Sequence, residues 1–391
     1  MHAASGSAGK RRGHAVRERA ARLQPRSTSP DPAPLRVLLL GANGRLGQAI
    51  ADALQMRPVA SGSSTSPDGA ADPIDLADPI DPADPIGSTD PASPNEPDDR
   101  IGATTLLTPT RAELNVEAGP GLAHGADRQH DLLRQCRRWL EPSDGAGPDV
   151  VINCIAMSDV DRCEQDEAAA MRINAELPAA LARAARERQV RLIHFSTDFV
   201  FDGTLRRPLV ETDPAAPLSA YGKSKLAGEQ AIAAENGSHW IFRVSWLYGS
   251  TRHNLAATLL DPARAGQLVR LADNRIGVPN PVQLIAREVC HALHSTDAPD
   301  GLYHLSCHGR TSWYEFGREF VTRAIAAGRL APARAPRIVA MDENAARRPA
   351  RRPPWSVLDP THYERTFGRK LPSWRDAIAF ALSTKTGRHS A

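Results

Sequence analysis

Residues 35–54 constrain the fold most, because a short apolar run leads there directly into a glycine-rich turn. Leu35 to Leu40 is typical of a buried strand, and Gln48 to Leu54 is typical of a helix. The glycines between them let the backbone turn tightly, approach a pyrophosphate and pack the helix against the strand; they are Gly41, Gly44 and Gly47. The helix N-terminus offers unpaired N–H groups to such an anion. This unit predicts a dinucleotide site rather than a plain turn.

The chain continues as an alternation of apolar runs and helical stretches. We expect strands at 104–107, 149–156 and 190–197, and helices at 131–140 and 167–189. Parallel strands that are covered on both faces produce such continuous apolar runs. The pattern predicts an α/β fold with a Rossmann-type doubly wound parallel sheet, whose ligands lie at the carboxyl ends of the strands. The segments expected at that edge are Gly41 to Gly47, Cys154 to Ser158, and Ser196 to Asp198.

Two segments do not have the composition of folded structure. Residues 1–34 are rich in arginine and poor in acid, and they carry no apolar region typical of a secretory signal. We predict a disordered basic extension or a mis-assigned start, rather than a transit peptide or an anion-binding arm. Residues 58–103 repeat Asp-Pro-Ile among Ser, Gly and Asp, which predicts a low-complexity insertion.

Composition excludes several classes of function. A net charge of +3 on 391 residues is too small to favour nucleic acid. No apolar run approaches the roughly 20 residues that span a bilayer, and five irregularly spaced cysteines favour a reducing cytoplasm. His304, Cys307 and His308 could be imagined as metal ligands, but Tyr303 to Cys307 alternates like a half-buried strand, so we predict no metal there.

Tyr221 and Lys225 are the candidate catalytic pair. Four residues apart on a helix, their side chains lie on one face. A free tyrosine has a pKa near ~10, and a cation held close stabilises the phenolate and lowers that pKa. The spacing alone also fits a solvated surface pair. Thr197, at the end of its predicted strand, can hydrogen-bond a substrate oxygen beside the phenol.

Taken together, the motifs resemble an extended short-chain dehydrogenase/reductase, and specifically the dTDP-4-dehydrorhamnose reductase family. The resemblance covers essentially 35–384 apart from the insertion. The matching segments are 41–47, 151–156, 160–164, 196–203, 216–229, 242–249, 301–305 and 351–359. The resemblance implies a Rossmann domain at 35–245 and a smaller, mainly substrate-binding domain at 246–384.

The resemblance also implies roles for single residues. Tyr221 would be the proton donor, Lys225 would hold the nicotinamide ribose, and Thr197 would complete the catalytic triad. The other implied cofactor contacts are Gly41, Gly44, Arg45, Leu46, Gly47, Arg111, Asn115, Val116, Ala156, Met157 and Ser158. The implied sugar-nucleotide contacts are Thr197, Asp198 and Trp246. The implied reaction transfers hydride from NAD(P)H to the C4 ketone of dTDP-4-dehydro-β-L-rhamnose and gives dTDP-L-rhamnose.

Three regions depart from the family pattern. Asn274-Arg275 and Asn280 replace an acid-amide pair and a threonine in a segment that shapes the sugar-nucleotide pocket, so the sugar stays open. Ala49 stands where some members carry a glutamate for a magnesium-mediated dimer, so both monomer and homodimer remain possible. Arg111 could accept a 2′-phosphate, which favours NADPH over NADH.

Two alternatives remain beside the main interpretation. One keeps the chemistry and reduces another nucleotide-linked 4-ketosugar. The other is a non-catalytic regulatory module that resembles the β subunit of methionine adenosyltransferase, in which 246–384 presents a partner surface. Intact Thr197, Tyr221 and Lys225 favour an enzyme.

Overall fold

The computed structural model describes residues 34–55, 104–108, 126–141, 146–249, 255–261, 263, 265–295 and 297–383. The predicted basic extension, apart from Pro34, and the predicted insertion lie outside these residues. Three predicted cofactor contacts also lie outside them: Arg111, Asn115 and Val116.

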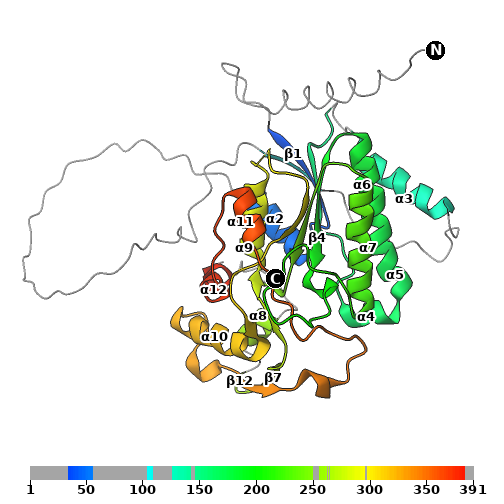
Figure 1. The fold of residues 1–391 in the computed structure, drawn as a ribbon. Coiled ribbons are helices and arrows are strands. Elements are labelled where there is room, and N and C mark those ends of the chain that lie inside the picture. Colours follow the sequence, from blue (N-terminus) through cyan, green and yellow to red (C-terminus); the bar gives the residue numbers. More distant parts are fainter. Residues whose placement is uncertain are drawn as a thin grey trace, which may run out of the picture.

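The centre of the structure is one sheet of six parallel strands (Figure 1). In spatial order the strands are β10 (Gly301–His304), β5 (His239–Val244), β4 (Arg191–Thr197), β3 (Val150–Asn153), β1 (Leu35–Leu40) and β2 (Thr104–Leu107). β1 pairs with both β2 and β3, so the strand order reverses there. Ligands of doubly wound sheets bind at such a point. The predicted Rossmann-type sheet is confirmed.

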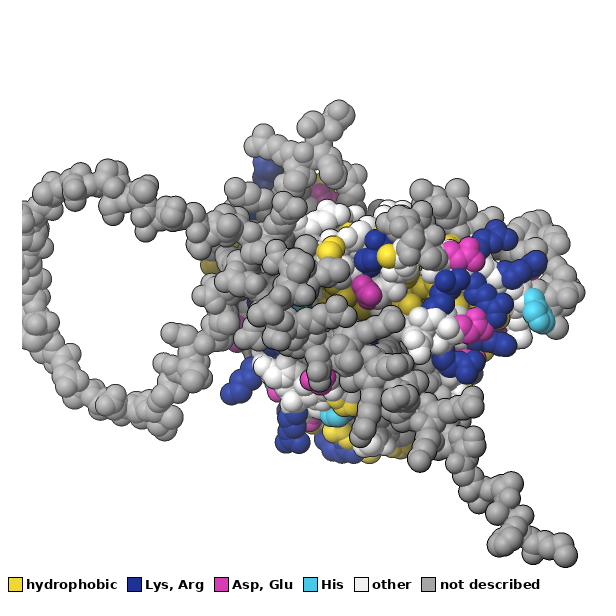
Figure 2. Space-filling model, turned by 90° about the horizontal axis from the view of Figure 1, so that it is seen from above, with side chains coloured by type: hydrophobic (Ala, Val, Ile, Leu, Met, Phe, Trp, Pro, Cys, Tyr) yellow, Lys and Arg dark blue, Asp and Glu magenta, His cyan; other side chains and the backbone are white. Residues whose placement is uncertain are grey.

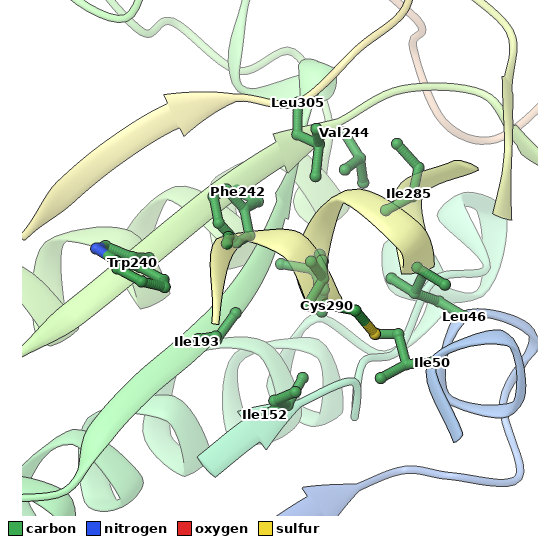
Figure 3. Close-up of a cluster of buried hydrophobic side chains, with 14 of the residues drawn as sticks. Leu46, Ile50, Ile152, Ile193, Trp240, Phe242, Val244, Ile285, Cys290 and Leu305 are labelled. Carbon is green, nitrogen blue, oxygen red and sulfur yellow. The ribbon is translucent and has the colours of Figure 1, made fainter. Parts of the chain in front are cut away.

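Helices cover both faces of the sheet (Figure 1). On one face lie α2 (Arg45–Gln55), α9 (Val282–Ala292) and α11 (Thr361–Phe367), and on the other α3 (Ala126–Trp139), α6 (Leu177–Glu187) and α7 (Ala220–Ala234). Successive side chains of a strand point to opposite faces. Val37 and Leu39 of β1 accordingly join the first core, which Figure 3 shows between α2, α9 and the strands, whereas Leu38 and Leu40 join the second. Each strand therefore contributes apolar side chains to a core on each face of the sheet, which explains the continuous apolar runs in the strand sequences.

The helix predicted at 167–189 is interrupted. It consists of α5 (Glu167–Met171), a π-helical turn (Arg172–Glu176) and α6. The turn carries Asn174, whose side chain accepts from the Met157 N–H at 2.9 Å and donates to the Ser224 hydroxyl at 3.0 Å. Single π-turns inside helices occur frequently at functional sites. This turn joins the loop after β3 to α7.

A smaller layer packs beside the sheet (Figure 1). Its main elements are β7 (Leu268–Ala272), which pairs in parallel with β12 (Arg337–Met341), and the helices α8 (Leu255–Leu260), α10 (Trp313–Ala326) and α12 (Trp374–Ser383). The remaining short elements are α4 (Val160–Gln165), β6 (Leu247–Tyr248), β8 (Ile276–Gly277), β9 (Asn280–Pro281) and β11 (Thr311–Ser312), with 3-10 turns at 198–200, 332–334 and 343–346. Because β10, α9 and α11 join the sheet layer although they follow residue 246, the division at 245/246 stays a prediction.

The half-buried strand expected at Tyr303 to Cys307 is wrong. All five side chains are buried, because β10 completes the sheet and the chain after it enters the core. Within the described residues, no group of three or more His, Cys, Asp or Glu side chains could hold a metal ion. No helix in that part of the chain is long and apolar enough to cross a membrane.

The visible surface mixes charges of both signs. On the described part of the face in Figure 2, basic and acidic side chains lie near one another. Ion pairs such as Arg137 with Glu187, at 2.7 Å, join helices α3 and α6 across the surface.

Candidate active site

The glycine turn after β1 is shaped for close backbone contact. Gly41 has φ +79°, and a Cβ there would lie 2.9 Å from the Cys154 carbonyl carbon. A Cβ on Gly47 would lie 2.2 Å from the Gly41 carbonyl oxygen. Both glycines are therefore required for α2 to begin this close to β1 and β3. The first turn of α2 then directs its free N–H groups to the switch point, as an anion site needs.

A cavity of about 450 Å³ lies at the carboxyl ends of the strands. It brings together ten predicted site residues from different elements: Gly44, Arg45, Leu46, Ala156, Ser158, Thr197, Asp198, Tyr221, Lys225 and Trp246. Gly41 and Gly47 shape the turn without lining the cavity. Met157 does not line it either, because its side chain is buried and its backbone bonds Asn174.

Tyr221 and Lys225 lie one turn apart on α7 and both line the cavity. Ser219 caps the N-terminus of the helix, where its hydroxyl accepts from the Gly222 N–H at 3.1 Å. A Cβ on Gly222 would lie 2.3 Å from the Phe199 carbonyl oxygen, so the glycine lets α7 approach the end of β4. The Tyr221 ring packs edge-on against Phe199 at 5.7 Å.

Thr197 lies beside Tyr221 in the cavity and is held by Asp198. Its hydroxyl donates to Asp198 Oδ1 at 3.0 Å and accepts from the Phe199 N–H at 3.2 Å. Burial raises the pKa of Asp198 to about 6, against hydrogen bonds from Ser356 and Thr197 that lower it. A carboxyl that titrates near neutrality therefore lies one residue from the predicted triad.

The predicted effect of Lys225 on Tyr221 is wrong for this arrangement of side chains. Burial raises the pKa of Tyr221, and the hydrogen bond from Thr197 only partly opposes it. Lys225 does not stabilise a phenolate here, because its Nζ lies 3.0 Å from His194 Nε2 and burial lowers its own pKa to about 8. Tyr221 is consequently a protonated phenol at neutral pH, which is the form that a proton donor needs.

Trp246 forms one wall of the cavity, with Trp313 of α10. The two indoles stack with ring centroids 3.9 Å apart and planes 6° apart. Trp246 has φ +43°, an uncommon value for a residue with a side chain. Its Nε1 is buried without a hydrogen-bond partner in the described structure.

Arg275 lies beside this wall and was not predicted as a site residue. It is 8% exposed, and its guanidinium lies 5.7 Å from the Phe199 ring and 5.9 Å from the Trp246 ring. Its Nη1 pairs with Glu343 at 3.3 Å, whereas its Nε is buried without a hydrogen-bond partner in the described structure. The buried guanidinium of Arg275 therefore has one N–H group left to donate to an oxygen atom of a ligand.

A second cavity of about 590 Å³ shares Arg275 and Arg352 with the first. Arginines dominate its charged lining: Arg206, Arg275, Arg347, Arg348, Arg351 and Arg352, against Asp202 and Glu343. Arg352 is held by two bonds to Asp161 of α4, at 3.2 and 2.8 Å. The matched segment 351–359 signalled this region, but its charge could not be placed without the tertiary structure.

The residues at 274–280 that depart from the family pattern lie in different surroundings. Asn274 lines the second cavity, where its side chain accepts from the Glu343 N–H at 3.0 Å. Asn280 is fully buried, donates to the Ser245 carbonyl at 2.8 Å and accepts from the Cys307 N–H at 2.6 Å. Asn280 therefore fixes the backbone and does not face either cavity.

Comparisons with known proteins agree with this geometry. The family described as RmlD substrate binding domain matches residues 122–386. The dTDP-4-dehydrorhamnose reductase of Burkholderia thailandensis is 38% identical over 245 residues, 61% of this chain and 82% of that relative. A probable dTDP-4,6-dihydroxy-2-methyloxan-3-one 4-ketoreductase of Streptomyces antibioticus is 37% identical over 237 residues, 60% and 77% of the two chains.

Solved structures share the fold. A dTDP-4-dehydrorhamnose reductase from Clostridium acetobutylicum superimposes with a TM-score of 0.66 at 25% identity, over 89% of this chain and 98% of that one. A protein of the same name from Bacillus anthracis, in complex with NADP, gives a TM-score of 0.65 at 22% identity, over 89% and 99%. With the matched family and the sequence relatives, these likenesses show that the chain belongs to the dTDP-4-dehydrorhamnose reductase (RmlD) family.

Proposed function

We propose that this protein reduces the C4 ketone of dTDP-4-dehydro-β-L-rhamnose to dTDP-L-rhamnose by hydride transfer from NAD(P)H. The observation that carries the proposal is the pair of Tyr221 and Thr197, which line together the cavity that begins at the glycine turn. The names of the sequence relatives supply the substrate.

The pair has the chemistry that carbonyl reduction requires. Hydride that arrives at a carbonyl carbon leaves negative charge on the oxygen, and a positioned acid delivers the balancing proton. Tyr221 is that acid, and Thr197 lies beside it in the cavity, with its hydroxyl held by Asp198 and the Phe199 N–H. Proton transfer of this kind contributes roughly 10²–10⁴-fold to the rate.

The residues present fit a nicotinamide dinucleotide. Gly41 and Gly47 let α2 begin close to the strands, and its N-terminus at the cavity suits a pyrophosphate held by Gly44, Arg45 and Leu46. Lys225, on the same wall as Tyr221, would hold the ribose of the nicotinamide, which supplies the hydride when bound. We favour NADPH, because Arg111 in the sequence can accept a 2′-phosphate and a structural neighbour binds NADP.

The sugar nucleotide fits the other end of the cavity. Trp246 with Trp313 offers a flat apolar wall for a deoxy-sugar, and Arg275 lies where the first cavity meets the arginine-rich second one. Guanidinium groups are well suited to bind a diphosphate. All five cysteines are free thiols, which supports a cytoplasmic location for this biosynthetic step.

A second candidate keeps the reaction and changes the ketosugar. Arg275 favours it, because a guanidinium replaces the amide of the family pattern within 6 Å of two rings of the first cavity. A relative of comparable similarity is also named as a ketoreductase of a different dTDP sugar.

The test uses purified protein, NADPH and dTDP-4-dehydrorhamnose, with loss of NADPH absorbance as the signal. We expect oxidation of NADPH and formation of dTDP-L-rhamnose. Oxidation only with another 4-ketosugar nucleotide would support the second candidate. If no ketosugar is reduced although NADPH binds, the enzyme proposal fails in favour of a regulatory module.

Tyr221→Phe tests the assigned acid. It should fold and bind NADPH but lose roughly 10²-fold or more of kcat. Tyr303→Phe is the matched control, because its hydroxyl bonds the Pro299 carbonyl at 2.6 Å outside the cavity. Normal turnover by Tyr221→Phe would remove the mechanism.

A further inference from the structure

Three buried polar side chains form a hydrogen-bonded chain from β3 to α7. Asn153 Nδ2 lies 3.1 Å from His194 Nδ1, and His194 Nε2 lies 3.0 Å from Lys225 Nζ. Their exposed fractions are 1%, 0% and 2% respectively. Because buried polar groups are costly to leave unpaired, the position of each hydrogen along this chain can be deduced from its partners.

The deduction starts from a backbone donor. The Ile155 N–H donates to Asn153 Oδ1 at 3.0 Å, which fixes that atom as the oxygen. Asn153 therefore presents its NH₂ group to His194, and His194 Nδ1 must accept. A neutral imidazole has one donor and one acceptor nitrogen, so Nε2 carries the hydrogen.

The Nε2–H of His194 points at Lys225 Nζ. An ammonium group has three donors and no acceptor, whereas an uncharged amine has a lone pair. Only the amine can accept the histidine hydrogen. The contact at 3.0 Å thus requires an uncharged lysine.

The other assignments leave donors facing each other. A charged His194 would aim N–H groups at both neighbours, and burial and the nearby lysine hold its pKa well below the ordinary value. A reversed Asn153 amide would place its NH₂ against the Ile155 N–H. Each buried donor left unpaired costs about 1–3 kcal/mol.

The surroundings of Lys225 also favour the amine. Glu229, one turn further along α7, is its acidic neighbour, but both carboxylate oxygens bond Arg243, at 2.9 and 2.7 Å. Burial raises the pKa of the Cys154 thiol, and burial together with the Asp198 charge raises that of Tyr221, so both stay protonated. Burial lowers the pKa of Lys225 to about 8.

We propose that His194 is a positioning residue that donates to the amine form of Lys225 and favours that form, and that binding of a dinucleotide shifts the lysine to the ammonium with uptake of a proton from solvent. The proposal rests on the proposed function for the identity of the dinucleotide. A ribose hydroxyl and nearby phosphates can accept from an ammonium, which His194 Nε2–H cannot. The cation that strengthens Tyr221 as an acid is then the favoured form in the complex.

The first experiment reads the histidine tautomer in the full-length protein alone. Labelling histidine with ¹⁵N and recording long-range ¹⁵N–¹H spectra distinguishes the two ring nitrogens. We expect His194 to be the neutral Nε2–H form at about pH 9, where the lysine is mostly the amine, and His194→Phe identifies its signals. A Nδ1–H tautomer or an imidazolium would overturn the proposal, whatever reaction the protein catalyses.

The second experiment counts protons taken up when NADPH binds. Calorimetric titrations near pH 8, in buffers of different ionisation enthalpy, should give an uptake of about half a proton, because a group is half deprotonated at its pKa. Lys225→Met should abolish the uptake. His194→Gln should reduce it while NADPH still binds, since its amide can turn an oxygen to an ammonium.

His304→Gln serves as the control, because His304 is also buried but bonds the Leu209 carbonyl, at 2.9 Å, and not the lysine. It should leave the uptake unchanged. Absence of uptake in the wild type, or unchanged uptake in His194→Gln, would overturn the proposal even if ketone reduction is normal. Failure to bind NADPH would instead contradict the proposed function, and the tautomer would still be readable.

Discussion

Trp246 and Trp313 stack with ring centroids 3.9 Å apart, although they belong to different layers of the structure. The backbone of Trp246 has φ +43°, a conformation that costs about 1–3 kcal/mol in residues other than glycine. Such strain persists where the surroundings fix it, and here it aims the indole across the cavity. Gly277 makes room, because a Cβ there would lie 2.5 Å from the Trp246 ring.

Gly277→Ala should therefore displace Trp246 and weaken binding of the sugar nucleotide. We expect KM for the ketosugar to rise about tenfold, the equivalent of about 1.4 kcal/mol, with an unchanged Kd for NADPH. Steady-state kinetics and a cofactor titration check this. Gly328→Ala is the control for an added methyl group, because no atom lies within 4 Å of the new Cβ, although its φ of +67° adds backbone strain that Gly277 does not have. Equal KM values in the two variants would contradict the prediction.

Arg275→Gln should reduce kcat/KM for the natural ketosugar nucleotide about 10- to 100-fold. Hydrogen bonds to charged groups contribute about 1.5–3 kcal/mol, and Arg275 is a buried cation shared by both cavities. Kinetics with a panel of nucleotide-linked ketosugars measures the change. Arg275→Lys should recover part of the loss, since it keeps the charge but not the planar fork. Unchanged selectivity in both variants would remove Arg275 from the substrate site.

Apolar runs and helical spacing in the sequence predicted the strands and helices whose formation depends on neighbouring residues. β1 spans Leu35–Leu40 as expected, because two cores draw alternate side chains of one apolar run. The strand expected at 149–156 ends at Asn153, since the chain after it leaves the sheet to line the cavity. Helical spacing placed Tyr221 and Lys225 on one wall, and the strand end placed Thr197 beside them.

Long-range pairing and burial could not be predicted in the same way. Arg275 meets Glu343 across 68 positions, and Arg352 meets Asp161 across 191. No local period reports such contacts. We expected Lys225 to lower the pKa of Tyr221 because the two residues are four positions apart on one helix. The expectation was wrong because Lys225 bonds His194, which lies on β4 and could not be placed from spacing along the helix.

Asp198→Asn should remove a pH dependence of the free energy of unfolding. The folded pKa of Asp198, about 6, lies above its ordinary value of 3.8. Its stabilising contribution is therefore present below pH 3.8 and is lost as the pH rises to about 6. We expect the variant to be roughly 1–3 kcal/mol more stable than wild type at pH 7 and equally stable below pH 3.8, by urea unfolding.

The same substitution affects the reaction. In the wild type, the plot of kcat/KM against pH should have a limb with an apparent pKa near 6. The reason is that ionised Asp198 changes the charge that Arg275 presents to the substrate. A pH–rate profile of Asp198→Asn should lack that limb. Its persistence in the variant would assign the ionisation to another group.

Lys225→Met should lose activity and gain stability, with a defined pH dependence. The folded pKa of about 8 lies below the ordinary 10.5, so the folded wild type binds fewer protons between these values. The wild type consequently loses stability as the pH falls from 10.5 to 8, whereas the variant does not. We expect the variant to be up to about 3 kcal/mol more stable at pH 7, an advantage that shrinks as the pH approaches 10. Urea unfolding at both pH values measures the difference, and Lys223→Met, on the exposed face of α7, should show no such trend. A constant difference between Lys225→Met and wild type would mean that the lysine is fully charged in the folded protein.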